Sequence, residues 1–82
     1  MGLDKYLKVS RIIKRRTVAN EACDAGRVVV NGKIARASYD VKVNDVIELT
    51  LGARTVKARV VSVNEYAKKD EAAMMYEIIE EK

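Results

Sequence analysis

Residues 26–35, Gly26-Arg27-Val28-Val29-Val30-Asn31-Gly32-Lys33-Ile34-Ala35, mark the point at which the chain changes from helical to strand-forming sequence. The three valines favour a β-strand, because branched side chains pack well on a pleated surface. Asn31-Gly32 is a strong signal for a two-residue hairpin turn, so Lys33–Ala35 is predicted to return as the paired strand. Gly26 is well placed to end a preceding helix in a left-handed turn.

Two short helices are predicted before this point. Leu3 and Leu7 lie one helical turn apart, and Asp4 lies in the first turn, where the helix dipole favours negative charge, so the first helix is expected over about residues 3–9. Thr17 is a candidate N-cap for the second helix. The helix face expected to pack on its neighbour contains Val18, Ala22 and Ala25, with Ala19 and Cys23 beside them.

A small sheet is predicted after the first hairpin. Asn44 can take a positive φ and marks a turn. Residues 46–51 then alternate between apolar and polar side chains, and Gly52-Ala53 closes a second hairpin into a strand over residues 54–63. The adjacent Val60-Val61 interrupts the alternation and predicts a β-bulge.

The C-terminal part is predicted as a helix over residues 68–75 followed by a strand over residues 76–79. The fold class is therefore α+β, with two short N-terminal helices packed on a small, mainly antiparallel sheet, then a short helix and a strand. The 82 residues leave room for one domain, residues 1–82, whose core is expected at about 3–63 with a C-terminal extension over 64–82.

The composition argues against an enzyme, a metal site and a membrane protein. The chain has no histidine and one cysteine, so the usual general base near neutral pH and the common zinc sites are missing, and no cofactor is expected. It has no run of about 20 apolar residues, which a membrane span needs, and no signal-peptide core at its start. The lone Cys23 cannot form an internal disulfide, which fits a cytoplasmic location.

The net charge of +4 is unevenly distributed. Residues 1–36 hold nine Lys/Arg and three Asp/Glu, residues 37–66 hold four of each, and residues 67–82 hold three Lys/Arg and five Asp/Glu. A positive field confined to one part of a small protein indicates a polyanionic partner such as nucleic acid.

The candidate RNA-binding residues concentrate before the second helix. Arg15 and Arg16 are the strongest candidates, because a guanidinium grips phosphate with two hydrogen bonds, and the helix start expected at Thr17 also attracts phosphate. The other candidates are Lys5, Lys8, Arg11, Lys14, Arg27, Lys33 and Arg36.

Aromatic residues are scarce in the basic half, where Tyr6 and Tyr39 are the only rings. Each is expected at the edge of the core, whereas proteins that bind single strands stack bases on exposed rings. Recognition of the shape and phosphates of largely double-helical RNA fits this composition better.

Several motifs in register resemble the RNA-binding domain named after small-subunit ribosomal protein four. They are Leu3-Asp4-Lys5-Tyr6-Leu7, Arg11, Arg16-Thr17, Ala19, Gly26-Arg27-Val28 and Val30-Asn31-Gly32-Lys33. That domain, also called the alpha-L motif, binds structured RNA through its helix pair. The resemblance implies that Arg16 and its basic neighbours meet ribosomal RNA.

Further stretches resemble the stand-alone bacterial family of heat-shock protein fifteen and RqcP. They are Lys8-Val9-Ser10-Arg11, Ile13-Lys14-Arg15-Arg16-Thr17 and Glu71-Ala72-Ala73-Met74-Met75-Tyr76. The resemblance implies binding to large-subunit rRNA and peptidyl-tRNA on obstructed large subunits, and support of C-terminal alanine tailing by an RqcH-like protein. A monomer is expected. The family usually has Arg where this chain has Gly2, and the broader domain often has Arg where Asn20 stands.

Three alternatives stay open. The chain could be a recycling factor that moves peptidyl-tRNA without tailing, the detached domain of an RNA-modifying enzyme, or a protein–protein adaptor whose basic face only contacts solvent. The free-standing length and the complete C-terminal strand pattern count against the detached domain.

Overall fold

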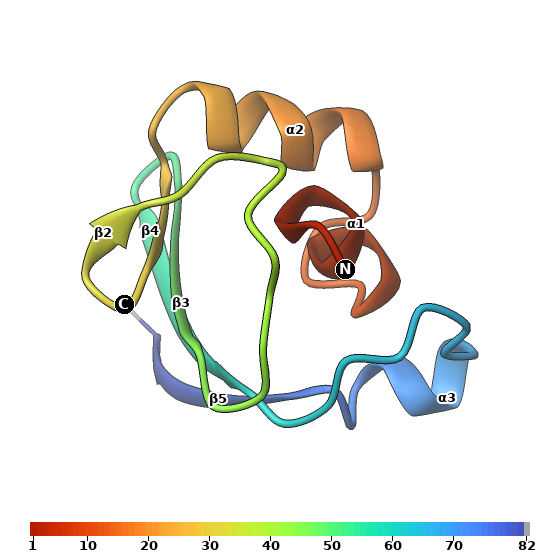
Figure 1. Cartoon of the computed structure of the whole chain (residues 1–82). Coiled ribbons are helices and arrows are strands. Elements are labelled where there is room, and N and C mark those ends of the chain that lie inside the picture. The colour runs from red at the N-terminus through yellow and green to blue at the C-terminus, as the bar shows by residue number, and fades with distance from the viewer. Residues whose placement is uncertain (82) are drawn as a thin grey trace.

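Helices α1 (Leu3–Val9) and α2 (Arg16–Asp24) pack against each other on one side of an antiparallel sheet in the computed structural model, which describes residues 1–81 (Figure 1). A third, short helix, α3 (Lys69–Ala72), lies near the C-terminal end of the described chain. The strands are β1 (Val28–Val30), β2 (Lys33–Ile34), β3 (Val46–Leu51), β4 (Arg54–Val60) and β5 (Tyr76–Glu81). This order confirms the predicted α+β class.

The sheet has the strand order β2-β1-β3-β4-β5 over the described residues, and every neighbouring pair is antiparallel. The first hairpin forms as predicted, because Asn31 (φ 52°) and Gly32 (φ 85°) both take the positive φ that a two-residue turn of this kind requires. Asn44 (φ 77°) also turns the chain as predicted. Its backbone N–H donates to the carbonyl of Val60 at 2.8 Å, which joins this turn to the end of β4.

The core lies between the helix pair and the sheet. Leu3, Tyr6 and Leu7 of α1 are fully buried, and they pack with Ile47 and Leu49 from the helix-facing side of β3. The intervening Glu48 of β3 is partly exposed, so the predicted alternation is confirmed over residues 46–49, whereas Leu51 at the end of the strand is exposed. Packing of two helices on one sheet face leaves the α1–α2 connector and the start of α2 at the outer edge of the molecule (Figure 1).

The second helix differs from the prediction in its start and its buried face. Arg15, not Thr17, is the N-cap residue; its extended backbone (φ −122°, ψ 132°) makes Arg16 the first helical residue, and no side chain caps the helix. The helix residues that lie in the core are Ala19, Ala22 and Cys23. Val18 is 41% exposed, so the predicted face that began at Val18 is rotated by about one residue.

The C-terminal part also differs in detail. The strand expected to reach Val63 ends at Val60, because the next two backbone N–H groups both donate to the carbonyl of Met75. The irregular register lies between Lys57 and Ala58 of β4, opposite β5, and not at Val60-Val61. The helix expected over residues 68–75 is the single turn of α3, and the last strand extends to Glu81.

The C-terminal strand is joined to the helix pair through one buried side chain. The Tyr6 hydroxyl donates a 2.8 Å hydrogen bond to the carbonyl of Met75. Met75 itself is buried in the core next to β5. Among residues 1–81, no helix is both long enough and apolar enough to cross a membrane.

Candidate RNA-binding surface

The connector between α1 and α2 exposes its cations because its two isoleucines turn inward, Ile13 into the core and Ile12 partly buried against it. Arg11 takes a left-handed conformation (φ 62°) directly after the buried Ser10, whose hydroxyl donates to the carbonyl of Leu7. This turn lets Ile13, only 5% exposed, enter the core, and its backbone N–H donates to the same carbonyl at 3.0 Å. Lys14 and Arg15 follow on the outside, both exposed.

Arg16 is held in place by Asp4 of the first helix. Its Nε donates to Oδ2 of Asp4 at 3.2 Å, and the side chains are 59% and 12% exposed, respectively. The bond uses Nε, so the two terminal amino groups of the guanidinium make no hydrogen bond within residues 1–81. Those two groups are the ones that grip a phosphate, and Asp4 therefore orients Arg16 without blocking it.

Asp4 is well suited to stay ionised at this position. It also accepts hydrogen bonds from the Lys5 backbone N–H at 2.8 Å and from Nδ2 of Asn20 at 3.5 Å. Burial alone raises the pKa of the Asp4 carboxyl, but the three hydrogen bonds and the positive charge of Arg16 together lower its pKa below the ordinary value. Asp4 is therefore negatively charged at neutral pH, next to the guanidinium of Arg16.

The two departures from the family pattern lie beside this carboxylate. Gly2 is the N-cap of α1, and its φ of −66° would accept any residue, but a Cβ there would lie 3.2 Å from Oδ1 of Asp4 and 3.3 Å from the carbonyl of Ala37. Asn20, on α2, points its amide at the same carboxylate. A larger residue at position 2 or a different side chain at position 20 would therefore change the surroundings of the Asp4 carboxylate.

We define the basic surface as the nine cations predicted to contact RNA, together with Thr17. Within the described chain, Lys5 pairs with Glu65 at 3.6 Å and Arg16 pairs with Asp4, while the remaining seven cations make no ion pair. These seven are Lys8, Arg11, Lys14, Arg15, Arg27, Lys33 and Arg36. They are all exposed.

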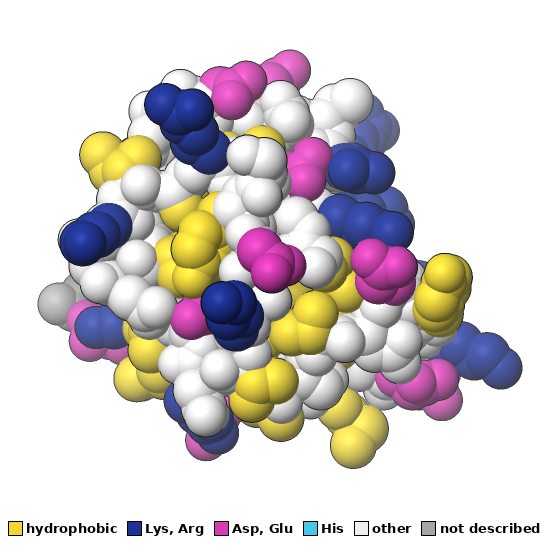
Figure 2. All heavy atoms as spheres, viewed as in Figure 1, with side chains coloured by type: hydrophobic (Ala, Val, Ile, Leu, Met, Phe, Trp, Pro, Cys, Tyr) yellow, Lys and Arg dark blue, Asp and Glu magenta, His cyan; other side chains and the backbone are white. Residues whose placement is uncertain are grey.

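The arginines of the sheet behave differently. Arg59 pairs with Glu77 at 2.8 Å, and Arg54 pairs with Glu81, in both cases across the β4–β5 strand pair. Figure 2 shows dark-blue Lys and Arg side chains gathered at the right-hand edge, where the start of α2 lies in the same view of Figure 1. Both arginines of the sheet are thus paired, whereas Lys14 and Arg15 at the start of α2 make no ion pair within residues 1–81.

Thr17 has a different place from the one predicted. It is the second residue of α2, exposed, and makes no capping hydrogen bond. The free N–H groups of the first helical turn still lie next to Lys14, Arg15 and Arg16, because these residues immediately precede or begin the helix. The prediction of cations around a helix start is therefore confirmed, with the start at Arg16.

A second carboxylate organises the first hairpin. Asp45, 8% exposed, accepts hydrogen bonds from Nδ2 of Asn31 at 3.0 Å, the Tyr39 hydroxyl at 2.8 Å and the Lys42 backbone N–H at 2.9 Å. Burial alone raises the pKa of Asp45, but these bonds lower it below the ordinary value. The loop that carries Arg36 is thereby tied to the hairpin turn.

Sequence reasoning missed the role of both carboxylates. The sequence links Asp4 only to the dipole of its own helix, and Asp45 only follows the turn predicted at Asn44. Their side-chain partners on other elements are distant in sequence: Arg16 and Asn20 lie 12 and 16 residues from Asp4, and Asn31 lies 14 residues from Asp45, so no local motif predicts these bonds. The available signal was indirect: a carboxylate in the first turn of a basic segment needs a cation nearby if it is buried.

The described residues offer no alternative chemical centre. Residues 1–81 contain no cluster of His, Cys, Asp and Glu that could hold a metal ion. Cys23 is buried, and burial, followed by the negative charges of Asp4 and Asp24, raises its pKa to about 11. Its thiol is therefore protonated at neutral pH and is a poor nucleophile.

Comparison with known proteins gives consistent matches. The S4 domain family model matches residues 1–47. The chain is 56% identical over 81 residues to the RQC P-site tRNA stabilizing factor of Streptococcus pneumoniae, covering 99% of this chain and 92% of that protein. It is 34% identical to heat shock protein 15 of Escherichia coli, covering 92% of this chain and 57% of that protein. The structure of trimeric heat shock protein 15 of Vibrio cholerae superposes with a TM-score of 0.86 at 26% identity, covering 95% of this chain and 80% of that one.

Proposed function

Because this chain belongs to the S4 domain family, and within it to the RQC P-site tRNA stabilizing factors, we propose that it binds large-subunit rRNA and peptidyl-tRNA on obstructed large ribosomal subunits. It acts there without catalysis, as a scaffold for ribosome-associated quality control. The relatives are named for stabilising tRNA in the P site, which describes binding and not a catalysed reaction, and this supports the proposal.

The observation that carries this proposal is the run of exposed cations next to Arg16, namely Arg11, Lys14 and Arg15, none of which makes an ion pair within residues 1–81. Exposed charges without partners give the start of α2 a positive potential, and RNA phosphates would release counterions on meeting them. Arg15 and Arg16 would clamp phosphates at the start of α2. The packed α1–α2 pair fixes the direction of these contacts, so that a backbone of defined shape is preferred over a flexible one.

Docking through rRNA would leave another part of the molecule to meet peptidyl-tRNA or an RqcH-like protein. In this arrangement the chain stabilises an elongation-competent state, and the RqcH-like protein adds alanine residues to the C-terminus of the stalled chain. We infer further that residues 1–82 act as one unit. The Tyr6–Met75 hydrogen bond and the β4–β5 pairing, both within residues 1–81, support a C-terminal extension that works together with the core.

The second candidate is a recycling factor that returns peptidyl-tRNA to a protected site without tailing. The similarity to heat shock protein 15 of Escherichia coli favours it. A reconstituted reaction with stalled large subunits and an RqcH-like protein separates the two. Alanine addition that depends on this chain supports tailing, whereas restored puromycin reactivity without added alanine supports recycling.

Co-sedimentation with large subunits at low salt tests the proposal itself. The chain should pellet with the subunits, and Arg15→Ala with Arg16→Ala should release it. The matched control is Arg54→Ala with Arg59→Ala, which removes the same charge from the ion-paired arginines of the sheet. Failure to pellet, or an equal loss in both double variants, would contradict the RNA-binding proposal and favour a protein–protein adaptor.

The chain is proposed to act as a cytoplasmic monomer. The Vibrio cholerae relative is described as trimeric, so the oligomeric state needs its own measurement. Light scattering of the free chain at several concentrations would give it, with a mass near 9.2 kDa expected throughout.

A further inference from the structure

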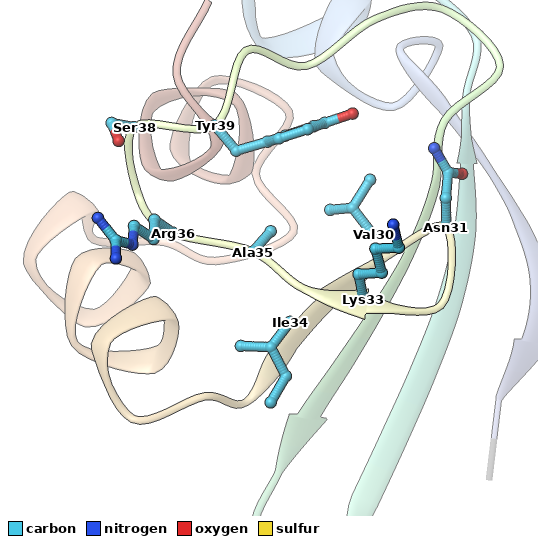
Figure 3. Close-up of a pocket in the computed structure, with 8 residues that line it drawn as sticks. All are labelled: Val30, Asn31, Lys33, Ile34, Ala35, Arg36, Ser38 and Tyr39. Carbon is cyan, nitrogen blue, oxygen red and sulfur yellow. The ribbon is translucent and has the colours of Figure 1, made fainter.

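A groove of about 590 Å³ lies between the β1–β2 hairpin and the loop that follows β2 (Figure 3). Its size suits one nucleotide, since pockets for small ligands begin at about 300 Å³. The side chains that matter for its chemistry are Val30, Lys33, Ile34, Arg36, Ser38 and Tyr39. No contact proposed above requires a concave site, so the groove calls for an occupant of its own.

An immobilised aromatic ring forms one wall. The Tyr39 hydroxyl donates to Oδ2 of Asp45 at 2.8 Å, and this fixes the far end of the side chain. The ring is half-buried against the core and extends from the loop toward Asn31 (Figure 3). A ring held at both ends loses little entropy when a flat group stacks on it, and every nucleobase presents a flat face.

The charges of the groove fit a nucleotide inside an RNA strand. Lys33 and Arg36 are exposed, and neither makes an ion pair within residues 1–81. In Figure 3 they stand apart, Lys33 beside the hairpin turn and Arg36 toward the α2 side of the loop. A free nucleotide carries phosphate at one end, but an internal nucleotide has one on each side, which matches two separated cations.

The lining contains no carboxylate that would repel RNA. Asp45 lies behind Tyr39, and its oxygens already accept three hydrogen bonds. Ile34 is 71% exposed, but its side chain points away from Tyr39 in Figure 3, so the apolar wall of the groove beside the ring consists of Val30 and Ala35.

The groove is also continuous with the basic surface. The loop that carries Arg36 is bound to α1 through the Asp4 backbone N–H, which donates to the carbonyl of Ala37 at 3.2 Å. One carboxylate-bearing residue, Asp4, therefore touches both this loop and Arg16. An RNA strand that reaches the start of α2 could thus pass the groove without leaving the positive region.

We propose that this groove holds one unpaired nucleotide of the bound RNA, with its base stacked on Tyr39 and its flanking phosphates on Lys33 and Arg36. The inference rests on the proposed function, because it assumes RNA as the partner. It adds to that function a preference for a bulged or loop nucleotide over a continuous helix. Specificity for one base is weak, since the Asn31 amide is already bonded to Asp45 and Val46, and the Ser38 hydroxyl is the one groove side chain free to meet a base edge.

Three RNAs test the proposal with the unmodified chain. The first is a stem with one bulged 2-aminopurine, the second has an abasic residue at the same position, and the third is the fully paired stem. Stacking on an aromatic side chain is worth about 1–3 kcal/mol per base, so the base-containing bulge should bind at least about fivefold more tightly than the abasic one. Its 2-aminopurine fluorescence should be quenched on binding.

Variants assign the effect to the ring. Tyr39→Leu should abolish the preference for the base-containing bulge, while Tyr39→Phe should keep it, because the ring remains and only the bond to Asp45 is lost. Arg36→Ala, at an exposed position, should weaken the binding of both bulged RNAs by the same factor. Circular dichroism of each variant confirms that it is folded.

The possible failures are distinguishable. If none of the three RNAs binds at low salt, the proposed function itself is wrong. If all three bind with equal affinity, or if Tyr39→Leu retains the preference, RNA binding stands and the nucleotide groove is wrong. Either of these two results would also be expected if the groove binds a protein instead of a nucleotide.

Discussion

The guanidinium of Arg16 at the start of α2 donates from Nε to Oδ2 of Asp4 on α1 across 3.2 Å. This bond joins the two helices at the place where the chain is most positive. The bond uses Nε, and the two terminal amino groups of Arg16, which make no hydrogen bond within residues 1–81, are the groups proposed to bind phosphate. The consequences can be measured.

Replacing Asp4 by Asn should weaken RNA binding although it makes the protein more positive. Asp4→Asn loses the charge-assisted bond to Arg16, and an affinity loss of about 1 kcal/mol, roughly fivefold in Kd, is expected. Fluorescence anisotropy with a structured RNA measures it. The control is Asp24→Asn on the exposed surface of α2, which changes net charge equally and should leave affinity unchanged or slightly higher. An equal increase in RNA affinity in both variants would show that affinity depends only on net charge and not on the Asp4–Arg16 bond.

The salt dependence of RNA binding should report the phosphate contacts of Arg15 and Arg16. Log affinity should fall linearly with log salt, by roughly 0.7–0.9 per phosphate contacted. Arg15→Ala with Arg16→Ala should reduce that slope by about 1.4–1.8 if each contacts one phosphate. Titrations between 50 and 200 mM salt, in the range where such effects are strong, provide the measurement. A flat response of the unmodified chain would indicate a protein partner.

Removing the Tyr6 hydroxyl should loosen the C-terminal strand. Tyr6→Phe loses a buried hydrogen bond to the Met75 carbonyl, which costs about 0.5–1.5 kcal/mol of unfolding free energy. A value near the lower end is expected, because that carbonyl also accepts from two backbone N–H groups. Urea denaturation measures the change. Tyr66→Phe, at a side chain that is 85% exposed, is the control and should have no effect.

Acid should destabilise the protein through Asp4 and Asp45. Both have a folded-state pKa below the ordinary value of 3.8, so ionising them stabilises the fold above that pH. This contribution is lost as the pH falls from about 4 through the lowered pKa values, because the folded carboxylates must then take up protons. Thermal unfolding followed from pH 6 to pH 2 checks the direction. In Asp45→Asn, stability should be lower at pH 6 and should depend less on pH below 4.

Several features of the fold followed from local sequence alone. The hairpin at Asn31-Gly32 and the turn at Asn44 formed where predicted, because positive φ depends on the residue itself and its immediate neighbours. The change from helix to sheet after Gly26 is equally local. The positive character of residues 1–36 needed only a count of charges.

Other features depended on contacts between distant residues. Local rules placed the start of α2 at Thr17, but the chain turns inward at Ile13 and becomes helical at Arg16, whose side chain bonds to Asp4 twelve residues earlier. The buried face of α2 shifted with that start. The bulge beside β5 also lay elsewhere than predicted, because register is set by the partner strand.

The sequence by itself therefore determined which elements form, where the main turns lie, and that the positive charge is concentrated in residues 1–36, since these depend on backbone preference and on a count of charges. Only the tertiary structure decided which cations are free and which are paired. Arg15 and Arg54 are both exposed arginines. Arg54 forms an ion pair with Glu81 across the β4–β5 strand pair, whereas Arg15 forms no ion pair within residues 1–81. The physical reason is that ion pairing depends on distance in space, which packing sets and residue order does not.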